Sequence, residues 1–240
     1  MSETDVIATE IIYPDSDGQP MAENTEQFQW IVVIKDNLES LFADDPQVFV
    51  AGDLLWYPVQ GRPDIRRAPD ALVAIGRPKG RRGSYQQWRE GDIAPQVVFE
   101  VLSPSNDQTE LALKFEFYDL YGVEEYYLYD PDSNDLAGWL RRDGRLRVIE
   151  TMDGWTSPRL GIRFALTPET LRLAYPNGQP FLTFVELREQ AVQAEQQAVQ
   201  AEQRAVQAEQ RAVQAEALAA RLAAQLRALG FDPAQGQEGG

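Results

Sequence analysis

Residues 95–130 read PQVVFEVLSPSNDQTELALKFEFYDLYGVEEYYLYD. The apolar run at 96–102 predicts a strand, the segment 107–121 predicts a helix, and the aromatic run at 125–130 predicts a second strand. Strands and helices that alternate in this way are typical of an α/β domain, in which helices cover a sheet. This stretch therefore predicts an α/β fold with a central sheet.

The flanking sequence supplies the other elements of this domain. A helix is expected at 25–42, where apolar residues recur at helical spacing. Further strands are expected at 48–57, 70–75 and 136–141, and a β-rich run at 145–165. Residues 1–23 are polar and contain Pro14, Gly18 and Pro20, which predicts a loose arm. The expected globular domain is 24–183.

Three residues of this domain are candidates for catalysis. Asp70 opens the run ALVAI, Glu100 interrupts the run VVFEVL, and Lys114 lies in the predicted helix. Carboxylates are hard oxygen ligands that suit Mg²⁺ or Mn²⁺. A lysine beside them can orient or deprotonate an attacking water and offset charge on a phosphoryl group. The trio therefore indicates metal-assisted hydrolysis of a phosphodiester.

The sequence segments around these residues resemble those of a known family. They are VFVAGDLLWYP at 48–58, PDALV at 69–73, EVLSPSN at 100–106, KFEFY at 114–118 and YGVEEYYLYDP at 121–131. In this order they resemble the Uma-type restriction endonuclease family of the PD-(D/E)XK nuclease-like superfamily. The resemblance implies a restriction-endonuclease-like core, a mixed central β-sheet flanked by helices, that binds DNA with Mg²⁺ or Mn²⁺ as cofactor.

The resemblance also implies roles for individual residues. Asp70 and Glu100 would be the acidic metal ligands, and the peptide carbonyl of Val101 would complete the metal shell. The usual lysine, two residues after the second acid, is replaced by Leu102. Lys114, on the following helix, fits its role, and Tyr118 lies one turn further along.

Other interpretations of these residues stay open. Asp70 follows a proline and would also suit a turn, Glu100 would carry no cost on an outward face, and Lys114 would suit a solvated helix face. Two more acids are candidates for the site: Glu39, and Asp53, for which a turn or edge position is favoured. Glu124 and Glu125 follow a glycine that ends the helix and are expected to face solvent.

The composition excludes several kinds of site. The 240 residues include no cysteine and no histidine, which rules out disulfides, thiolate or imidazole zinc sites and Ser-His-Asp triads within this sequence. No apolar run is long enough to cross a membrane, and the first ten residues lack the features of a signal peptide. A cytoplasmic protein with no membrane partner is expected.

The formal net charge is −16, yet basic residues gather in one stretch. The loop GRPKGRRGSYQQW at 76–88 lies within it. Its cations are expected to hold phosphates while its aromatic rings stack on unpaired bases. The predicted nucleic-acid-binding residues are Arg77, Lys79, Arg81, Arg82, Tyr85 and Trp88. A solvated hairpin without a partner is the alternative.

From Phe184 to Leu229 the sequence changes to alanine-rich heptads of the form AVQAEQ(Q/R). Small apolar residues recur at alternating spacings of three and four, which is typical of a coiled coil. With this seam at positions a and d, Arg204 and Arg211 fall at g, and Glu209 and Glu216 fall at e. A homodimer is expected, and if its helices are parallel, Arg204 would face Glu209 of the partner subunit. A third helix, a tail that folds back and a single solvated helix are the alternatives. Residues 230–240 are expected to be a disordered tail.

Two functions follow from these features. The first is a divalent-metal-dependent DNA endonuclease that dimerises through its C-terminal helix, with RNA as a second possible target. The second is a nuclease-fold scaffold without catalysis that binds nucleic acid or protein. The presence of Asp70, Glu100 and Lys114 together favours the nuclease.

Overall fold

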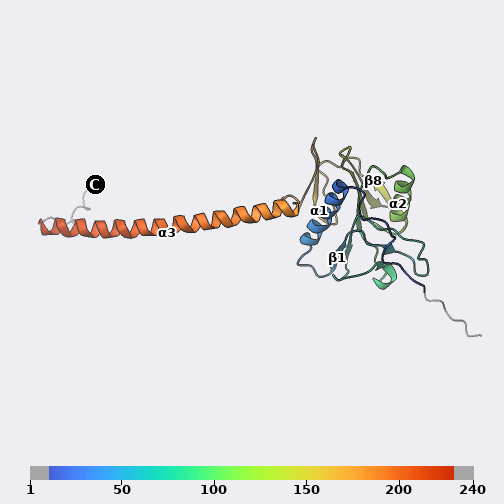
Figure 1. Ribbon diagram of the computed structural model, residues 1–240, viewed down its shortest axis with the longest axis horizontal. Helices are drawn as coiled ribbons and strands as arrows, with labels where there is room; N and C mark the ends of the chain where they lie inside the picture. Colours follow the sequence, from blue (N-terminus) through green and yellow to red (C-terminus); the bar gives the residue numbers. More distant parts are fainter. Residues whose placement is uncertain (1–10, 230–240) are drawn as a thin grey trace, which may run out of the picture. The chain divides into compact units, whose positions relative to one another are not determined.

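The computed structural model describes residues 11–229 (Figure 1). Its contacts divide the chain into two units, one ending at Thr183 and the other beginning at Phe184. The first unit is an α/β domain and the second is a single helix. The predicted fold class is confirmed, whereas the tail expected at 230–240 lies outside the described residues. Residues 11–23 contain no helix or strand.

The elements of the domain follow the predicted order closely. The helix α1 begins after Asn24, whose side chain accepts a hydrogen bond from the backbone N–H of Gln27, and α2 begins after Asp107, which accepts one from Glu110. The bounds are α1 Thr25–Leu41, β1 Val48–Ala51, β2 Trp56–Tyr57, β3 Ala71–Ile75, β4 Tyr85–Gln86, the 3₁₀ helix η1 Gln87–Arg89, β5 Val97–Val101, α2 Gln108–Leu120, β6 Glu125–Asp130, β7 Asp135–Arg142, β8 Arg145–Val148, β9 Arg163–Leu166 and β10 Leu171–Ala174.

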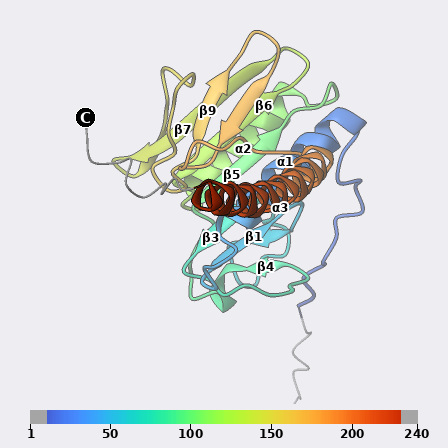
Figure 2. The same ribbon diagram turned by 90° about the vertical axis from the view of Figure 1, so that its left-hand side faces the viewer.

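The central sheet has six strands in the order β1-β3-β5-β6-β7-β8. Within this sheet, only β5 and β6 are parallel, and α2 connects them; the other neighbouring pairs of the sheet are antiparallel. Figure 2 shows β1 and β3 toward one end of this sheet and β6 and β7 toward the other. The strand-helix-strand stretch at 95–130 thus forms the middle of the domain.

The two faces of the sheet are covered by different helices. Val97, Phe99 and Val101 of β5 pack in one apolar cluster with α1 and with the β9-β10 hairpin. Val98, between them, packs in a second cluster that contains Phe117 and Tyr118 of α2. Because side chains alternate along a strand, Glu100 points to the same face as Val98, toward α2.

The strand expected at 48–57 is interrupted, and β1 and β2 belong to different sheets. Asp53 lies between them with φ of 48°, a left-handed conformation that breaks a strand. Its N–H donates to the carbonyl of Pro69 at 3.0 Å. At Gly52, a Cβ would lie 3.2 Å from the carbonyl oxygen of Asp70, so this turn brings the backbone close to Asp70.

The expectation that Glu125 faces solvent is wrong, because its side chain is fully buried at the start of β6. Its carboxylate accepts hydrogen bonds from the Tyr127 hydroxyl at 2.9 Å, the Arg159 N–H at 2.7 Å and the Ser157 hydroxyl. Burial raises its pKa, and these donors oppose that rise. They lie up to 34 residues away, where local sequence gives no sign of them.

The second unit is the helix α3, Phe184–Ala228, which matches the predicted heptad segment. None of its residues is buried, and the apolar residues at both ends of the seam are exposed, for example Phe184 at 79% and Leu222 at 51%. The helix is confirmed, and its pairing stays a prediction. No helix within residues 11–229 has the length and apolar character needed to cross a membrane.

Candidate active site

Asp70 directly precedes β3, and only 9% of its surface is exposed. Its Oδ2 accepts a hydrogen bond from the backbone N–H of Val101 at 2.6 Å, which ties it to the end of β5. Burial raises its pKa well above the usual value for aspartate. The charge of Glu100 raises this pKa further, while Lys114 opposes the rise. A buried carboxylate beside another acid is costly unless a cation joins it.

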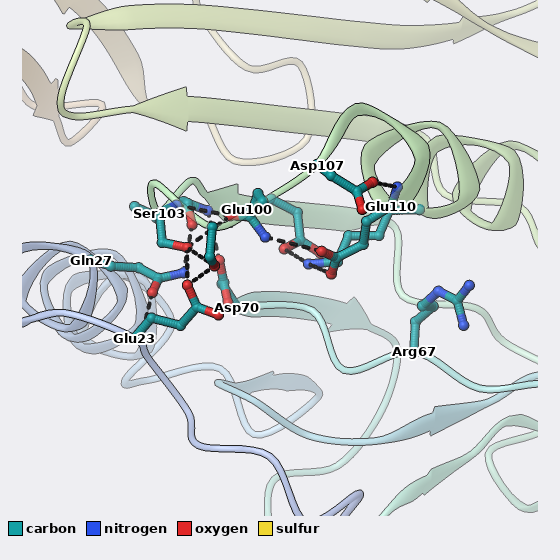
Figure 3. Close-up of polar contacts among 12 residues, drawn as sticks. Glu23, Gln27, Arg67, Asp70, Glu100, Ser103, Asp107 and Glu110 are labelled. Atoms are coloured by element: carbon teal, nitrogen blue, oxygen red, sulfur yellow. Dashed lines mark hydrogen bonds and ion pairs between the residues drawn. The ribbon is translucent and has the colours of Figure 1, made fainter.

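Glu100 is also buried, with 2% of its surface exposed, and both of its oxygens accept hydrogen bonds from α2. Lys114 Nζ donates to Oε2 at 2.9 Å, and the Tyr118 hydroxyl donates to Oε1. Lys114 and Tyr118 are one helical turn apart, so both side chains reach the same carboxylate. The predicted trio is therefore assembled in one place, since Lys114 binds Glu100 and the charges of both act on Asp70. Figure 3 shows Asp70 and Glu100 close together.

The charge state of Lys114 bears on its role. Burial by itself would lower its pKa, but the charges of Glu100 and Asp70 raise it above the usual value for lysine. The ammonium group therefore keeps its proton at neutral pH. A protonated lysine cannot remove a proton from water. The raised pKa therefore favours a role in which Lys114 orients the attacking water and offsets charge, rather than a role as general base.

A cleft of about 730 Å³ opens onto this site, and Asp70 and Lys114 line it. Residues from the segment 17–23, from α1 and from the loops around Arg66 and Ser103 complete its walls. Asp70 and Lys114 are therefore accessible to a substrate in the cleft, while Glu100 is buried in the protein behind them. A rigid strand and helix hold the charged groups at the floor of an accessible space, as a catalytic site requires.

Sequence reasoning missed two residues that contact the end of β5 and the loop that follows it. Gln27, which is 7% exposed, donates from Nε2 to the carbonyl of Val101 at 2.9 Å. Glu23 accepts a hydrogen bond from the Ser103 hydroxyl at 2.6 Å, and Figure 3 shows both side chains beside Asp70. The local signal for Gln27 was a polar residue on the buried, mainly apolar face of α1, which also carries Asn37.

The chemistry of the donors suits a divalent metal ion. Asp70, Glu100 and the Val101 carbonyl offer only oxygen atoms, which Mg²⁺ and Mn²⁺ prefer. Each also accepts a hydrogen bond within the protein. Within residues 11–229 no group of three or more acidic side chains gathers as a metal cluster. The set fits an ion that is bound through two carboxylates and keeps water and phosphate in its shell.

The two further acids differ in their relation to the site. Glu39 pairs with Lys35 on an exposed face of α1, so it does not reach the site. Asp53 lines the same cleft as Asp70. Burial, Asp17 and Glu100 raise the pKa of Asp53, while Lys114 lowers it, so Asp53 belongs to the electrostatic surroundings of the site and also lies in the turn that was favoured.

The loop predicted to bind nucleic acid is mostly engaged within the protein. Arg77 and Arg82 both bind Glu90, at 3.1 and 2.7 Å, and Arg82 also lies 3.9 Å above the ring of Phe49. Lys79 donates to the carbonyl of Ala43 at 3.1 Å. Arg77 and Arg82 thus share an acidic partner, whereas Lys79 is exposed and contacts neutral carbonyl groups, and phosphate binding by these three cations stays a prediction.

The two aromatic residues of that loop, Tyr85 and Trp88, also make contacts within the protein. Tyr85 is fully buried, and its hydroxyl donates to the carbonyl of Ile93 at 2.7 Å, so the prediction that it stacks on bases is wrong. Trp88 is half-buried and packs against Tyr13 with ring centroids 4.9 Å apart. Arg81 is exposed. Neither Trp88 nor Arg81 is among the residues that line the cleft.

Comparison with known proteins identifies a family and several solved structures. A family model described as "Uma2: Putative restriction endonuclease" matches residues 12–182. A crystal structure described as a "putative nuclease belonging to DUF820 from Anabaena variabilis ATCC 29413" is 17% identical, covers 59% of this chain and 76% of its own, and has a TM-score of 0.44. A comparison with curated proteins finds no match.

Proposed function

Given that this chain belongs to the Uma2 family, described as "Putative restriction endonuclease", we propose that it is a divalent-metal-dependent endonuclease that hydrolyses DNA phosphodiester bonds. One observation carries the proposal: Asp70 and Lys114 line a single cleft and Glu100 joins them from behind. The matched region, 12–182, contains all three residues.

The proposed roles follow from the positions of the groups. Asp70, Glu100 and the Val101 carbonyl would hold Mg²⁺ or Mn²⁺, and the ion would act as a Lewis acid toward the phosphoryl group. Asp70 is fixed by the Val101 N–H, so its free oxygen is directed by the end of β5. Lys114 would orient the attacking water and offset negative charge on the phosphoryl oxygens.

Tyr118 and Gln27 are proposed as positioning residues. Tyr118 holds one oxygen of Glu100 while Lys114 holds the other, so the carboxylate has a fixed orientation. Gln27 holds the carbonyl of Val101, which is the third proposed oxygen donor. Such partners orient the ligands of a metal ion and tune its binding.

The metal requirement is the first test of this proposal. Purified protein comprising residues 1–240 is expected to cut plasmid DNA with Mg²⁺ or Mn²⁺ and to lose all cutting in EDTA. Without the ion, the proposed site has too little positive charge to stabilise the negative charge that develops on the phosphoryl oxygens. Gel electrophoresis of the plasmid measures this, with single-stranded DNA and RNA as alternative substrates. Cutting that persists in EDTA would reject the metal-dependent mechanism, and no cutting of any substrate would favour the scaffold function.

We also propose that α3 joins two copies of this chain as a parallel coiled coil. Its apolar seam is exposed along the whole helix. Arg204 and Glu209 lie five positions apart on opposite sides of the seam, where one helix does not bring them together. In a parallel pair, Arg204 would meet Glu209 of the partner subunit. Such pairing would bring two active sites to one DNA duplex.

Removal of α3 is expected to change the assembly completely. A chain truncated after Leu187 loses the alanine seam and should be a monomer. The chain of residues 1–240, with a mass of 27.0 kDa, should form a dimer of twice 27.0 kDa. Light scattering measures both. As a charge control, Arg204→Glu with Arg211→Glu should weaken the dimer, and mixing with Glu209→Arg/Glu216→Arg should restore it. An unchanged mass after truncation would reject the zipper.

A further inference from the structure

Two arginines that the predicted basic loop does not include line the cleft. Arg66 and Arg67 are half-buried and lie in its wall together with Asp70 and Lys114. Within residues 11–229 neither makes an ion pair. The neighbouring Asp64 is held by Arg62, at 2.6 and 2.9 Å.

Neutral groups hold these arginines in place. Arg66 donates to the carbonyl of Pro63 at 2.8 Å. Arg67 donates to the carbonyl of Arg66 at 2.8 Å and lies 5.7 Å above the ring of Phe117. Carbonyl oxygens and an aromatic ring fix a guanidinium group without cancelling its charge. Figure 3 shows Arg67 with no interaction drawn to the acidic residues of the site.

The backbone of Arg67 is fixed relative to the site. Trp56 and Arg67 form an isolated antiparallel bridge, with N–O distances of 2.8 and 3.2 Å in the two directions. Trp56 is fully buried. Asp70 follows Arg67 by three residues, so one short segment carries both a cleft cation and a proposed metal ligand. Groups that bind adjacent parts of one substrate benefit from such a rigid link.

From these contacts we infer that Arg66 and Arg67 bind the backbone phosphates of a DNA strand beside the bond that is cut. The inference rests on the proposed nuclease function and adds the residues that hold its substrate. Arginine binds phosphate with two parallel N–H groups. None of the cations of the loop 76–88, by contrast, lines the cleft, and two of them, Arg77 and Arg82, are half-buried and paired with Glu90. The cleft lining also contains six acidic residues, so its phosphate contacts fall to these two arginines beside Lys114.

The test compares two double variants that lose the same amount of charge. In Arg66→Ala/Arg67→Ala the cleft loses both arginines, and in Arg142→Ala/Arg147→Ala two exposed arginines outside the cleft lining are lost. Binding of a fluorescein-labelled DNA duplex is measured by anisotropy in EDTA, so that no metal-dependent cleavage occurs. The cleft variant is expected to raise Kd about tenfold or more, and the control less than about twofold.

Salt dependence gives a second readout. Each lost phosphate contact lowers the slope of log K against log salt by about 0.9 on duplex DNA, so the cleft variant should lose about 1.8 and the control nothing. Arg66→Lys/Arg67→Lys should keep most of the slope because the charge remains. If this lysine variant still binds DNA, the weaker binding of the alanine variant comes from the lost charge. Thermal melting by circular dichroism checks separately that each variant is folded.

Three results would overturn the inference: equal loss of affinity in both double variants, unchanged affinity in the cleft variant, or no binding of DNA by the wild-type chain. The proposed function fails separately. DNA binding that depends on Arg66 and Arg67, without cutting under any metal, would reject the nuclease and keep the phosphate site. Cutting that does not depend on Arg66 and Arg67 would keep the nuclease function and reject the phosphate site.

Discussion

Replacing Asp70 by asparagine is expected to abolish cleavage and to stabilise the metal-free protein. A neutral amide is a poor ligand for a divalent ion, so Asp70→Asn should lower metal-dependent cutting roughly a thousandfold. The side-chain carbonyl of the amide can still accept the hydrogen bond from the Val101 N–H. Because the variant removes a buried negative charge beside Glu100, its free energy of unfolding should rise by about 1–2 kcal/mol at neutral pH.

The pH dependence gives this prediction a specific form. The folded-state pKa of Asp70 is raised above 3.8, so its contribution to stability is full below that value and declines as the pH rises through the raised pKa. Urea unfolding in EDTA should therefore show the gap between variant and wild type growing from about pH 4 upward. A variant that is less stable than wild type at every pH would contradict the repulsion between Asp70 and Glu100.

Replacing Glu100 by alanine is expected to abolish cleavage as well, but with the opposite effect on stability. Lys114 and Tyr118 would both lose their buried acceptor. Removal of one partner of a buried ion pair costs about 3–5 kcal/mol. The free energy of unfolding should fall by about 3 kcal/mol, since Lys114 keeps 16% exposure and a neighbouring Glu110 at 3.6 Å.

Two variants sharpen this second prediction. Glu110→Ala removes the exposed partner of the same lysine and should change stability by less than about 1 kcal/mol. Glu100→Leu/Lys114→Met replaces the buried pair with apolar groups and should regain most of the lost stability without regaining activity. Urea unfolding and plasmid cleavage measure the two properties. Cleavage that survives in Glu100→Ala would reject the site assignment.

The two carboxylates thus have different physical positions although the sequence suggested the same role for both. Asp70 is held by a backbone N–H and faces the cleft, so its charge is only partly compensated. Glu100 has two side-chain donors and lies behind the cleft. The difference explains why removal of one charge should stabilise the fold and removal of the other should destabilise it.

Local sequence was sufficient to predict most of the elements. The stretch 95–130 carries its own strand, helix and strand, and the structure places them at β5, α2 and β6. The heptads of α3 likewise predict a helix over nearly the observed bounds. The order and type of these elements follow from periodicity, because the spacing of apolar residues matches the geometry of a helix or strand.

The amino-acid sequence was thus enough to predict the α/β order of elements, the heptad helix and the grouping of Asp70, Glu100 and Lys114 as candidates. It could not show which charged groups are free, and that emerged from the folded domain. The fold buries Glu125, pairs Arg77 and Arg82 with Glu90, and places Arg66 and Arg67 in the cleft with no ion pair to any acid of the described residues 11–229. Burial and ion pairing depend on residues far apart in the chain, as when Gln27 binds the carbonyl of Val101, 74 residues away.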